Sequence, residues 1–383
     1  MNEVRAQGEV CGRHYSSGEF MKLEWDGGVI TRFESVDVEP RVWLAPGLFD
    51  LQINGFGGID FQQDGLSVED LLRASRALRA SGCTRFLLTL ITAEWKTLTS
   101  RLRHLRSLRA QSAELQSAIA GWHVEGPFLS KEAGFHGAHD PALLVEPTPE
   151  HILELRSIAD DDPLLLTMSP EVNGVNRAIR IAIEQNIKVS IGHTNASTAQ
   201  IEAAVKAGAT GFTHLGNGCP RLLDRHDNIL WRILDRGDLM VSLIPDKIHV
   251  SPALFRLVHR LIDTQSISYI TDAMAAAGMP PGKFTLGKLE VEVSPDQVVR
   301  QPGQCLFAGS ALKPIDGAFR AADMLGTRWQ DVWGRFSEAP AAFMGLRNEL
   351  AVGQPADFCL LNLSNGAGTP EIRVYKAGIP FAP

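Results

Sequence analysis

Short apolar runs alternate with longer amphipathic stretches from about residue 46 onward. The runs predict strands over 48–53, 84–90, 119–124, 164–168, 188–191, 211–214, 240–244 and 268–271. Between them, apolar positions recur at helical spacing and predict helices over 68–79, 175–185, 198–207 and 252–262. The helix expected from Thr198 is preceded by two possible N-caps, Asn195 and Ser197, and stops before Gly208. Strand and helix units in this succession predict a (β/α)8 TIM barrel.

The two ends of the chain have strand patterns without helices. Alternating apolar positions occur at 20–25, 29–33 and 42–44 near the start, and strand-like runs at 358–363 and 372–376 near the end. Neither end is long enough to bury a core of its own. We therefore expect residues 1–45 and 350–383 to combine into one small β-sandwich domain beside a barrel formed by residues 46–349.

Composition narrows the class of protein. Hydrophobic residues make up 44% of the chain and charged residues 21%, which is typical of a globular protein. The net charge is −7 and no basic run occurs, so we expect no binding to nucleic acid or to an anionic membrane. No apolar run is long enough to span a bilayer. The five cysteines are widely spaced and the start of the chain is polar, so we expect a cytoplasmic protein.

Four polar residues stand at the carboxyl ends of predicted strands: Glu125, His193, His214 and Asp272. Barrel enzymes build their active sites at that face. Two imidazoles and a carboxylate are the ligands of a catalytic zinc that keeps one position open, and a further carboxylate can move the proton of bound water. Each residue alone has a structural explanation, since a carboxylate can cap a turn and a histidine can be a core residue. Together, in register with the strands, they predict a metal hydrolase.

Longer motifs surround these residues and extend over essentially the whole chain. They are A-P-G-L-F-D-L-Q-I-N-G-F-G-G (45–58), H-V-E-G-P-F (123–128), G-A-H-D (137–140), S-P-E (169–171), G-H-T-N-A (192–196), T-H-L-G-N (213–217), I-H-V (248–250), T-D-A (271–273) and A-G-S-A-L (308–312). The chain resembles the N-acetylglucosamine-6-phosphate deacetylases of the amidohydrolase superfamily. That resemblance implies an amidohydrolase barrel with a small β domain made from both termini, which agrees with the pattern of elements.

The resemblance also implies roles for the polar residues. Glu125, His193 and His214 would hold one divalent metal ion, usually zinc. Asp272 would be the general base that deprotonates the metal-bound water and later protonates the departing amine. His139 would polarise the acetamide carbonyl alongside the metal. The reaction implied is hydrolysis of N-acetylglucosamine 6-phosphate to glucosamine 6-phosphate and acetate.

Substrate contacts follow from the same resemblance. The implied residues are Ala138, His139, Asn217, Gly218, Arg225, His249, Phe307, Ala308 and Gly309. Arg225 stands where the family has a phosphate-binding arginine, often donated by the neighbouring subunit of a homodimer, and His249 would belong to the same pocket. Many amidohydrolases carry His-x-His at the first strand for a second metal. This chain has Gln52 and Asn54 there, and because neutral amides are poor zinc ligands we expect a single ion.

The chain departs from the family pattern around the expected substrate. Gly216, Gly218 and Cys219 replace an aromatic residue and an Ala-Met pair, Lys247 replaces a glycine, His226 an acidic residue and Lys313 a threonine. The lysines could reinforce binding of an anionic sugar. Alternatively, the substrate is a different N-acylated sugar or amide, or the barrel binds an amino sugar without turning it over. Retention of the four strand-end residues argues against the last alternative.

Overall fold

The computed structural model describes residues 6–302, 307–363 and 370–381. Eight parallel strands form the central sheet, in the order β14-β13-β12-β11-β10-β9-β8-β5. Their bounds are β5 Leu48–Ile53, β8 Cys83–Ile91, β9 Ile119–Glu125, β10 Leu164–Met168, β11 Lys188–Ile191, β12 Gly211–Phe212, β13 Met240–Leu243 and β14 Ile267–Tyr269. Each predicted barrel strand is therefore confirmed, with ends that differ by at most two residues.

The first and last strands come together and close the barrel. Ile53 forms a parallel bridge with Ala273, and the backbone N–H of Asn54 donates to the Ala273 carbonyl at 2.7 Å. Asp50 of β5 reinforces this seam, because one of its carboxylate oxygens accepts from Thr271 N at 3.0 Å and from Thr271 Oγ1 at 2.8 Å. The segment after β14 is thereby held beside the end of β5.

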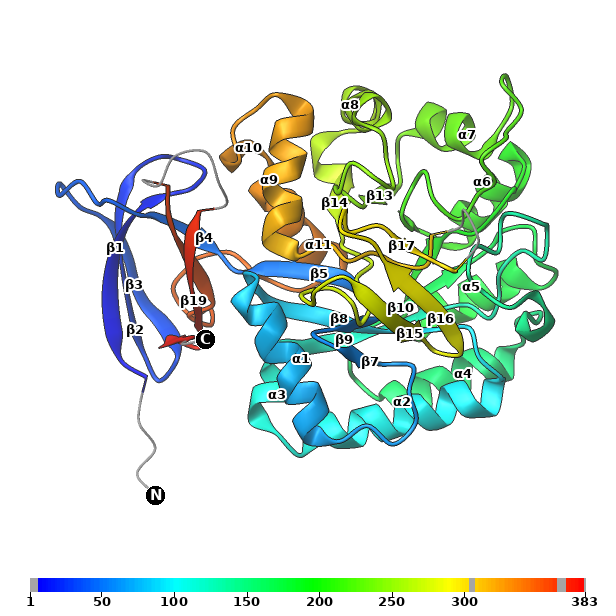
Figure 1. The fold of residues 1–383 in the computed structure, drawn as a ribbon, viewed down its shortest axis with the longest axis horizontal. Coiled ribbons are helices and arrows are strands. Elements are labelled where there is room, and N and C mark those ends of the chain that lie inside the picture. Colours follow the sequence, from blue (N-terminus) through cyan, green and yellow to red (C-terminus); the bar gives the residue numbers. More distant parts are fainter. Residues whose placement is uncertain (1–5, 303–306, 364–369, 382–383) are drawn as a thin grey trace.

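Helices surround the sheet (Figure 1). They are α1 Val68–Ala80, α2 Trp95–Ala110, α3 Ala113–Ala118, α4 Pro149–Ala159, α5 Val175–Glu184, α6 Thr198–Ala207, α7 Ile229–Arg236, α8 Pro252–Leu261, α9 Pro314–Leu325, α10 Gln330–Trp333 and α11 Glu338–Phe343, with short 3-10 turns at Pro141–Leu143, Thr264–Ser266 and Gly334–Phe336. The four predicted helices correspond to α1, α5, α6 and α8. Ser197 caps α6 as expected: its side chain accepts from Gln200 N, and the helix ends at Gly208. None of the helices in the described part of the chain is both long and apolar enough to cross a membrane.

Strands from both ends of the chain form a separate sheet beside the barrel (Figure 1). These strands are β1 Gly8–His14, β2 Phe20–Asp26, β3 Val29–Ser35, β4 Trp43–Pro46, β18 Phe358–Asn362, β19 Glu371–Lys376 and β20 Ile379–Pro380, in the order β20-β19-β18-β4-β1-β2-β3. The Trp25 ring lies 5.4 Å from that of Phe358 and 5.7 Å from that of Tyr375, although β1 and β4 separate their strands in the sheet. The sheet therefore folds over on itself around a shared core, which confirms a small β domain made from both termini.

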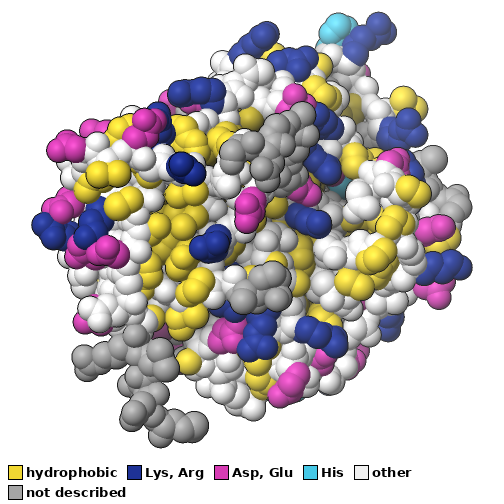
Figure 2. Space-filling view, turned by 60° about the vertical axis from the view of Figure 1, so that its left-hand side comes forward, with side chains coloured by type: hydrophobic (Ala, Val, Ile, Leu, Met, Phe, Trp, Pro, Cys, Tyr) yellow, Lys and Arg dark blue, Asp and Glu magenta, His cyan; other side chains and the backbone are white. Residues whose placement is uncertain are grey.

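The outer face of this small sheet is charged. Lys22 pairs with Glu9 and Glu24, each at 2.8 Å, and Arg32 pairs with Glu34 at 2.9 Å. Figure 2 shows these side-chain types interspersed over this part of the surface. Of the five cysteines, Cys305 lies outside the described residues and the other four are free thiols.

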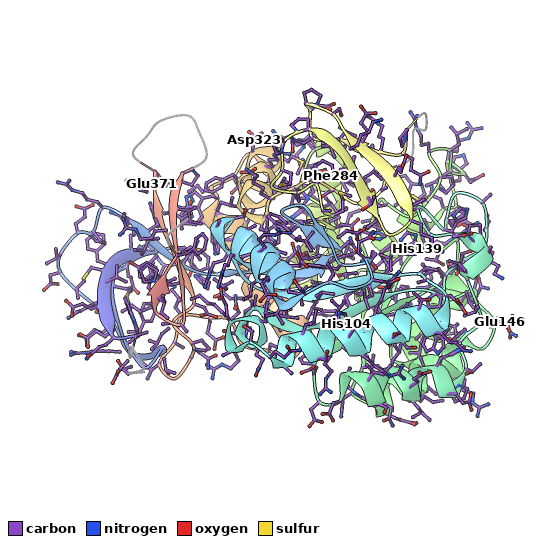
Figure 3. All side chains as sticks on the ribbon, turned by 60° about the horizontal axis from the view of Figure 1, so that its bottom comes forward. His104, His139, Glu146, Phe284, Asp323 and Glu371 are labelled. Carbon is purple, nitrogen blue, oxygen red and sulfur yellow. The ribbon has the colours of Figure 1, made fainter. Side chains whose placement is uncertain are left out.

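A small three-stranded sheet, which was not predicted, follows the last barrel strand. It consists of β15 Gly282–Leu286, β16 Leu289–Val293 and β17 Val299–Arg300. A hairpin of β6 Gly55–Phe56 and β7 Ile59–Asp60 contacts the turn between β15 and β16. The Asp60 carboxylate accepts from Gly287 N at 2.8 Å. Apolar side chains of this sheet share a core with Met274 and Ala138, and Figure 3 marks Phe284 on the sheet and His139 in the neighbouring loop.

Candidate active site

Glu125, His193 and His214 meet at the carboxyl end of the barrel. Glu125 Oε1 lies 2.8 Å from His214 Nε2 and 3.3 Å from His193 Nε2, and the two Nε2 atoms are 3.1 Å apart. All three side chains are buried, and in the described part of the chain they form the one cluster with metal-ligand spacing. Ligand atoms at zinc distance in a tetrahedral arrangement stand about 3.3 Å apart. The three residues therefore fit a metal ion and leave a fourth position open.

The backbone and the second ring nitrogen hold these ligands in place. His193 Nδ1 lies 3.0 Å from the Phe135 carbonyl oxygen, which can only accept, so Nδ1 carries the proton and Nε2 keeps its lone pair for a metal. The backbone N–H of His214 donates to Ser242 Oγ at 2.8 Å. His193, His214 and Asp272 have φ of 50°, 35° and 52°, a left-handed conformation that costs energy for such residues and recurs at functional sites.

Asp272 is held by the two amides of the first strand. Its Oδ1 accepts from Asn54 Nδ2 at 2.6 Å and from Gln52 Nε2 at 3.0 Å. Gln52 and Asn54 therefore face the site, and their side-chain N–H groups are engaged by this carboxylate. Burial, together with the negative charge of Glu125, raises the pKa of Asp272 to about 7. A carboxyl group with a pKa near neutrality can both take and return a proton.

His139 completes the buried cluster from the loop after β9. Its Nδ1 lies 2.8 Å from Thr92 Oγ1, and its Nε2 lies 3.7 Å from Glu125 Oε2. Burial, followed by the neighbouring His193, lowers the pKa of His139 to about 3, so the ring is neutral at physiological pH. Thr92 was not among the predicted site residues, because nothing in the sequence connects it with His139.

These groups open into a pocket of about 620 Å³. Most of the predicted substrate-binding residues line it: Ala138, His139, Asn217, Gly218, His249, Phe307 and Gly309. Ala308 is buried in the core beneath the β15–β17 sheet and is not part of the lining. The prediction that Arg225 belongs to this pocket is not met within one chain, because Arg225 is exposed and lies outside the lining.

Two positively charged side chains that were not predicted line the pocket instead. Arg221 comes from the loop after β12 and Arg300 from β17. The Arg300 guanidinium lies 5.9 Å from the centre of the Phe307 ring, and that ring lies 4.8 Å from His249. His249 Nδ1 is 2.6 Å from Asp246 Oδ2, whereas its Nε2 is buried without a hydrogen-bond partner among the described residues.

The lysines that depart from the family pattern lie elsewhere. Lys247 Nζ pairs with Asp323 of α9, and Lys247 is outside the pocket lining. Lys313 is exposed at the N-cap of α9, also outside the lining. Neither lysine therefore lines the pocket within one chain, and the suggestion that they reinforce binding of an anionic sugar gains no support from their positions. Lys247 has φ of 68°, in the left-handed region that glycine adopts readily and lysine does not.

Comparison with known proteins places the chain among amino-sugar deacetylases, although no family model matches it. N-acetylglucosamine-6-phosphate deacetylase of Mus musculus is 32% identical over 335 residues, which cover 83% of this chain and 79% of that protein. The chain belongs to the N-acetylglucosamine-6-phosphate deacetylase family. The structure of the family member from Mycobacterium smegmatis in complex with N-acetyl-D-glucosamine-6-phosphate superimposes with a TM-score of 0.87 at 27% identity, covering 98% of this chain and 99% of that one. N-acetylgalactosamine-6-phosphate deacetylase of Escherichia coli O157:H7 is 30% identical over 333 residues, 86% of each chain.

Proposed function

We propose that this member of the family hydrolyses the acetamide of an N-acetylhexosamine 6-phosphate, with N-acetylglucosamine 6-phosphate as the preferred substrate. The observation that carries the proposal is the Glu125, His193 and His214 cluster beside Asp272, opening into a pocket with cationic and polar walls. The names and the coverage of the relatives support the same reaction. The products are acetate and the hexosamine 6-phosphate.

Glu125, His193 and His214 would hold one divalent ion, with Zn²⁺ favoured by two imidazoles and a carboxylate. When bound, the ion would make water more acidic and would polarise the acetamide carbonyl. A single ion is supported by the first strand, where the N–H groups of Gln52 and Asn54 point at Asp272. An amide N–H cannot ligate a cation.

Asp272 would take a proton from the attacking water and later return it to the departing amine. Its buried position and its pKa near neutrality support both steps. His139, neutral and next to Glu125, would orient and polarise the acetamide carbonyl. Asn217, Gly218 and His249 would contact the sugar phosphate, and the loop of Phe307 to Gly309 would lie along the sugar.

N-acetylgalactosamine 6-phosphate is a second candidate substrate. The Escherichia coli relative named for that sugar is 30% identical, close to the 32% of the mouse glucosamine relative, so identity does not separate the two sugars. The two differ at one ring carbon, which would meet the substrate end of the pocket rather than the metal.

We further propose a homodimer in the cytoplasm. Leu222 is 90% exposed and Trp231 41% exposed, and both lie close in sequence to Arg225. A second copy that covered these apolar side chains would also bring Arg225 against another molecule, as the family resemblance implies. Four free cysteines among the described residues support a reducing compartment.

Release of acetate from four sugars tests the proposed function: the two N-acetylhexosamine 6-phosphates and their unphosphorylated forms. We expect turnover of N-acetylglucosamine 6-phosphate, slower turnover of the galactosamine compound, and little cleavage of the neutral sugars. Metal analysis should find one ion per chain. Asp272→Asn should keep that ion and lose turnover. Equal cleavage of phosphorylated and neutral sugars, or full activity of Asp272→Asn, would contradict the proposal.

A further inference from the structure

The positive charge of the pocket comes from residues that belong to this subunit. Among the described residues that line the pocket, Arg221 and Arg300 are the two with a cationic side chain of constant charge. Both are exposed, whereas the metal-ligand cluster is buried, so the two arginines stand toward the open end of the pocket. A substrate with its acetamide at the metal cluster would therefore direct its other end toward them.

Neither guanidinium has a hydrogen-bond or ion-pair partner among the described residues. Arg300 lies over the face of the Phe307 ring, and the charge of the exposed Asp296 carboxylate acts on it without a close ion pair. Arg232 in the same region shows the opposite situation, because it pairs with Asp227 at 2.6 Å. An arginine fork that keeps its donors free can bind phosphate with two parallel hydrogen bonds.

Arg300, Phe307 and His249 follow one another along the pocket wall. The β17 strand is bridged to Phe307 through Arg300, which fixes the position of the arginine backbone. The centre of the Phe307 ring lies 5.9 Å from the Arg300 guanidinium and 4.8 Å from the centre of the His249 ring. His249 has an Nε2 atom that is buried and without a partner among the described residues. An anion at His249 would therefore share the pocket with the Arg300 guanidinium.

We propose that Arg300, together with Arg221, binds the phosphate group of the substrate within the same subunit. The inference rests on the proposed function and deepens it, because it gives the β15–β17 sheet the task of recognising the phosphate. Arg225 of the same chain does not line this pocket, so any contribution from Arg225 would come from a second copy.

Steady-state kinetics of Arg300→Gln and Arg221→Gln test this assignment. Each variant should raise KM for N-acetylglucosamine 6-phosphate about 10- to 100-fold with kcat nearly unchanged, because one charge-assisted contact is lost. Arg300→Lys should recover part of the effect, since it keeps the charge without the fork. KM for the unphosphorylated sugar should not change. Arg260→Gln, an exposed arginine on α8 outside the pocket, is the matched control and should behave as the unaltered protein.

Binding of inorganic phosphate to the metal-loaded protein, measured by calorimetry, separates the two levels of the proposal. If none of the sugars is cleaved but phosphate binds and Arg300→Gln weakens it about 10-fold or more, the proposed function fails and the anion site stands. If the phosphorylated sugar is cleaved but both glutamine variants keep the original KM and phosphate affinity, the site assignment is overturned. An equal rise in KM for neutral and phosphorylated sugars would also overturn it, because it would show a loss of shape rather than of charge recognition.

Discussion

Replacement of Asn54 by alanine removes the shorter of the two hydrogen bonds at Asp272 Oδ1, 2.6 Å against 3.0 Å for Gln52. A hydrogen bond to a charged group contributes about 1.5–3 kcal/mol. Because the amide stabilises the ionised carboxylate, its loss should raise the pKa of Asp272 by about 1–2 units. The ionised base then becomes scarcer at neutral pH. Because the pKa of Asp272 is about 7, half of the base is ionised at pH 7, and we expect kcat at that pH to fall about 5- to 50-fold.

The assay is kcat and KM for acetate release between pH 5.5 and 9, with metal content measured on the same samples. The ascending limb of the kcat profile should move to higher pH in Asn54→Ala, while KM and the single metal ion are retained. Gln52→Ala, which loses the longer bond, should give a smaller shift in the same direction. Asn173→Ala is the matched control, since Asn173 donates to Glu146 at 3.1 Å in an exposed amide–carboxylate pair remote from the pocket.

Three results would refute this reasoning. An unchanged pH profile would show that Asn54 does not set the protonation of Asp272. Loss of the metal ion from Asn54→Ala would mean that the amide acts at the metal. A change confined to KM would mean that Asn54 binds the substrate rather than the base.

Three further perturbations follow from the same geometry. The double substitution Gln52→His and Asn54→His should raise the zinc content from one to two ions per chain, because it places two imidazole ligands beside the Asp272 carboxylate. Metal analysis checks this. Burial raises the pKa of Asp50 from 3.8 to about 7, so between these pH values Asp50 is ionised in the unfolded chain but protonated in the folded one. The free energy of unfolding should therefore fall by up to about 4 kcal/mol as the pH rises from 4 to 7. Asp50→Asn should flatten this dependence in urea unfolding, and a parallel slope would contradict the assignment. Lys247→Gly relieves φ of 68° at the cost of an exposed ion pair, so Tm should stay or rise with KM unchanged. A higher KM in Lys247→Gly would instead show that Lys247 contributes to substrate binding.

The barrel could be predicted because its signals are local. The helix Thr198–Ala207 was predicted with the bounds that the structure has, since Ser197 and Gly208 mark its ends by capping chemistry. The strand that leads to His214 is shorter than expected and ends at Phe212. His214 leaves the strand because φ of 35° turns its side chain toward the cluster, a requirement of the site rather than of strand propensity.

The partners within the site could not be predicted in the same way. Asn54 and Asp272 are 218 residues apart in sequence, and they meet only because the barrel closes between its first and last strands. Arg300 was missed for a different reason. The alternating pattern of β15 and β16 around Gly287 is a readable hairpin signal, but it does not say that the hairpin covers the pocket.

The two ends of the pocket are therefore built from different parts of the fold: the metal-ligand end from the barrel strands, and the outer end from loops and the β15–β17 sheet. Glu125 ends β9, and His193 and His214 follow β11 and β12 closely, so the closed barrel largely sets where the three residues meet. One loop contact, from the Phe135 carbonyl, also holds His193. Arg221, His249 and Arg300 belong to loops and to an added sheet, where insertions and substitutions are tolerated. Relatives named for two different sugars have nearly the same identity to this chain, 32% and 30%. Exchanging the 282–300 segment between such relatives should accordingly change KM and sugar preference while metal content stays at one ion per chain.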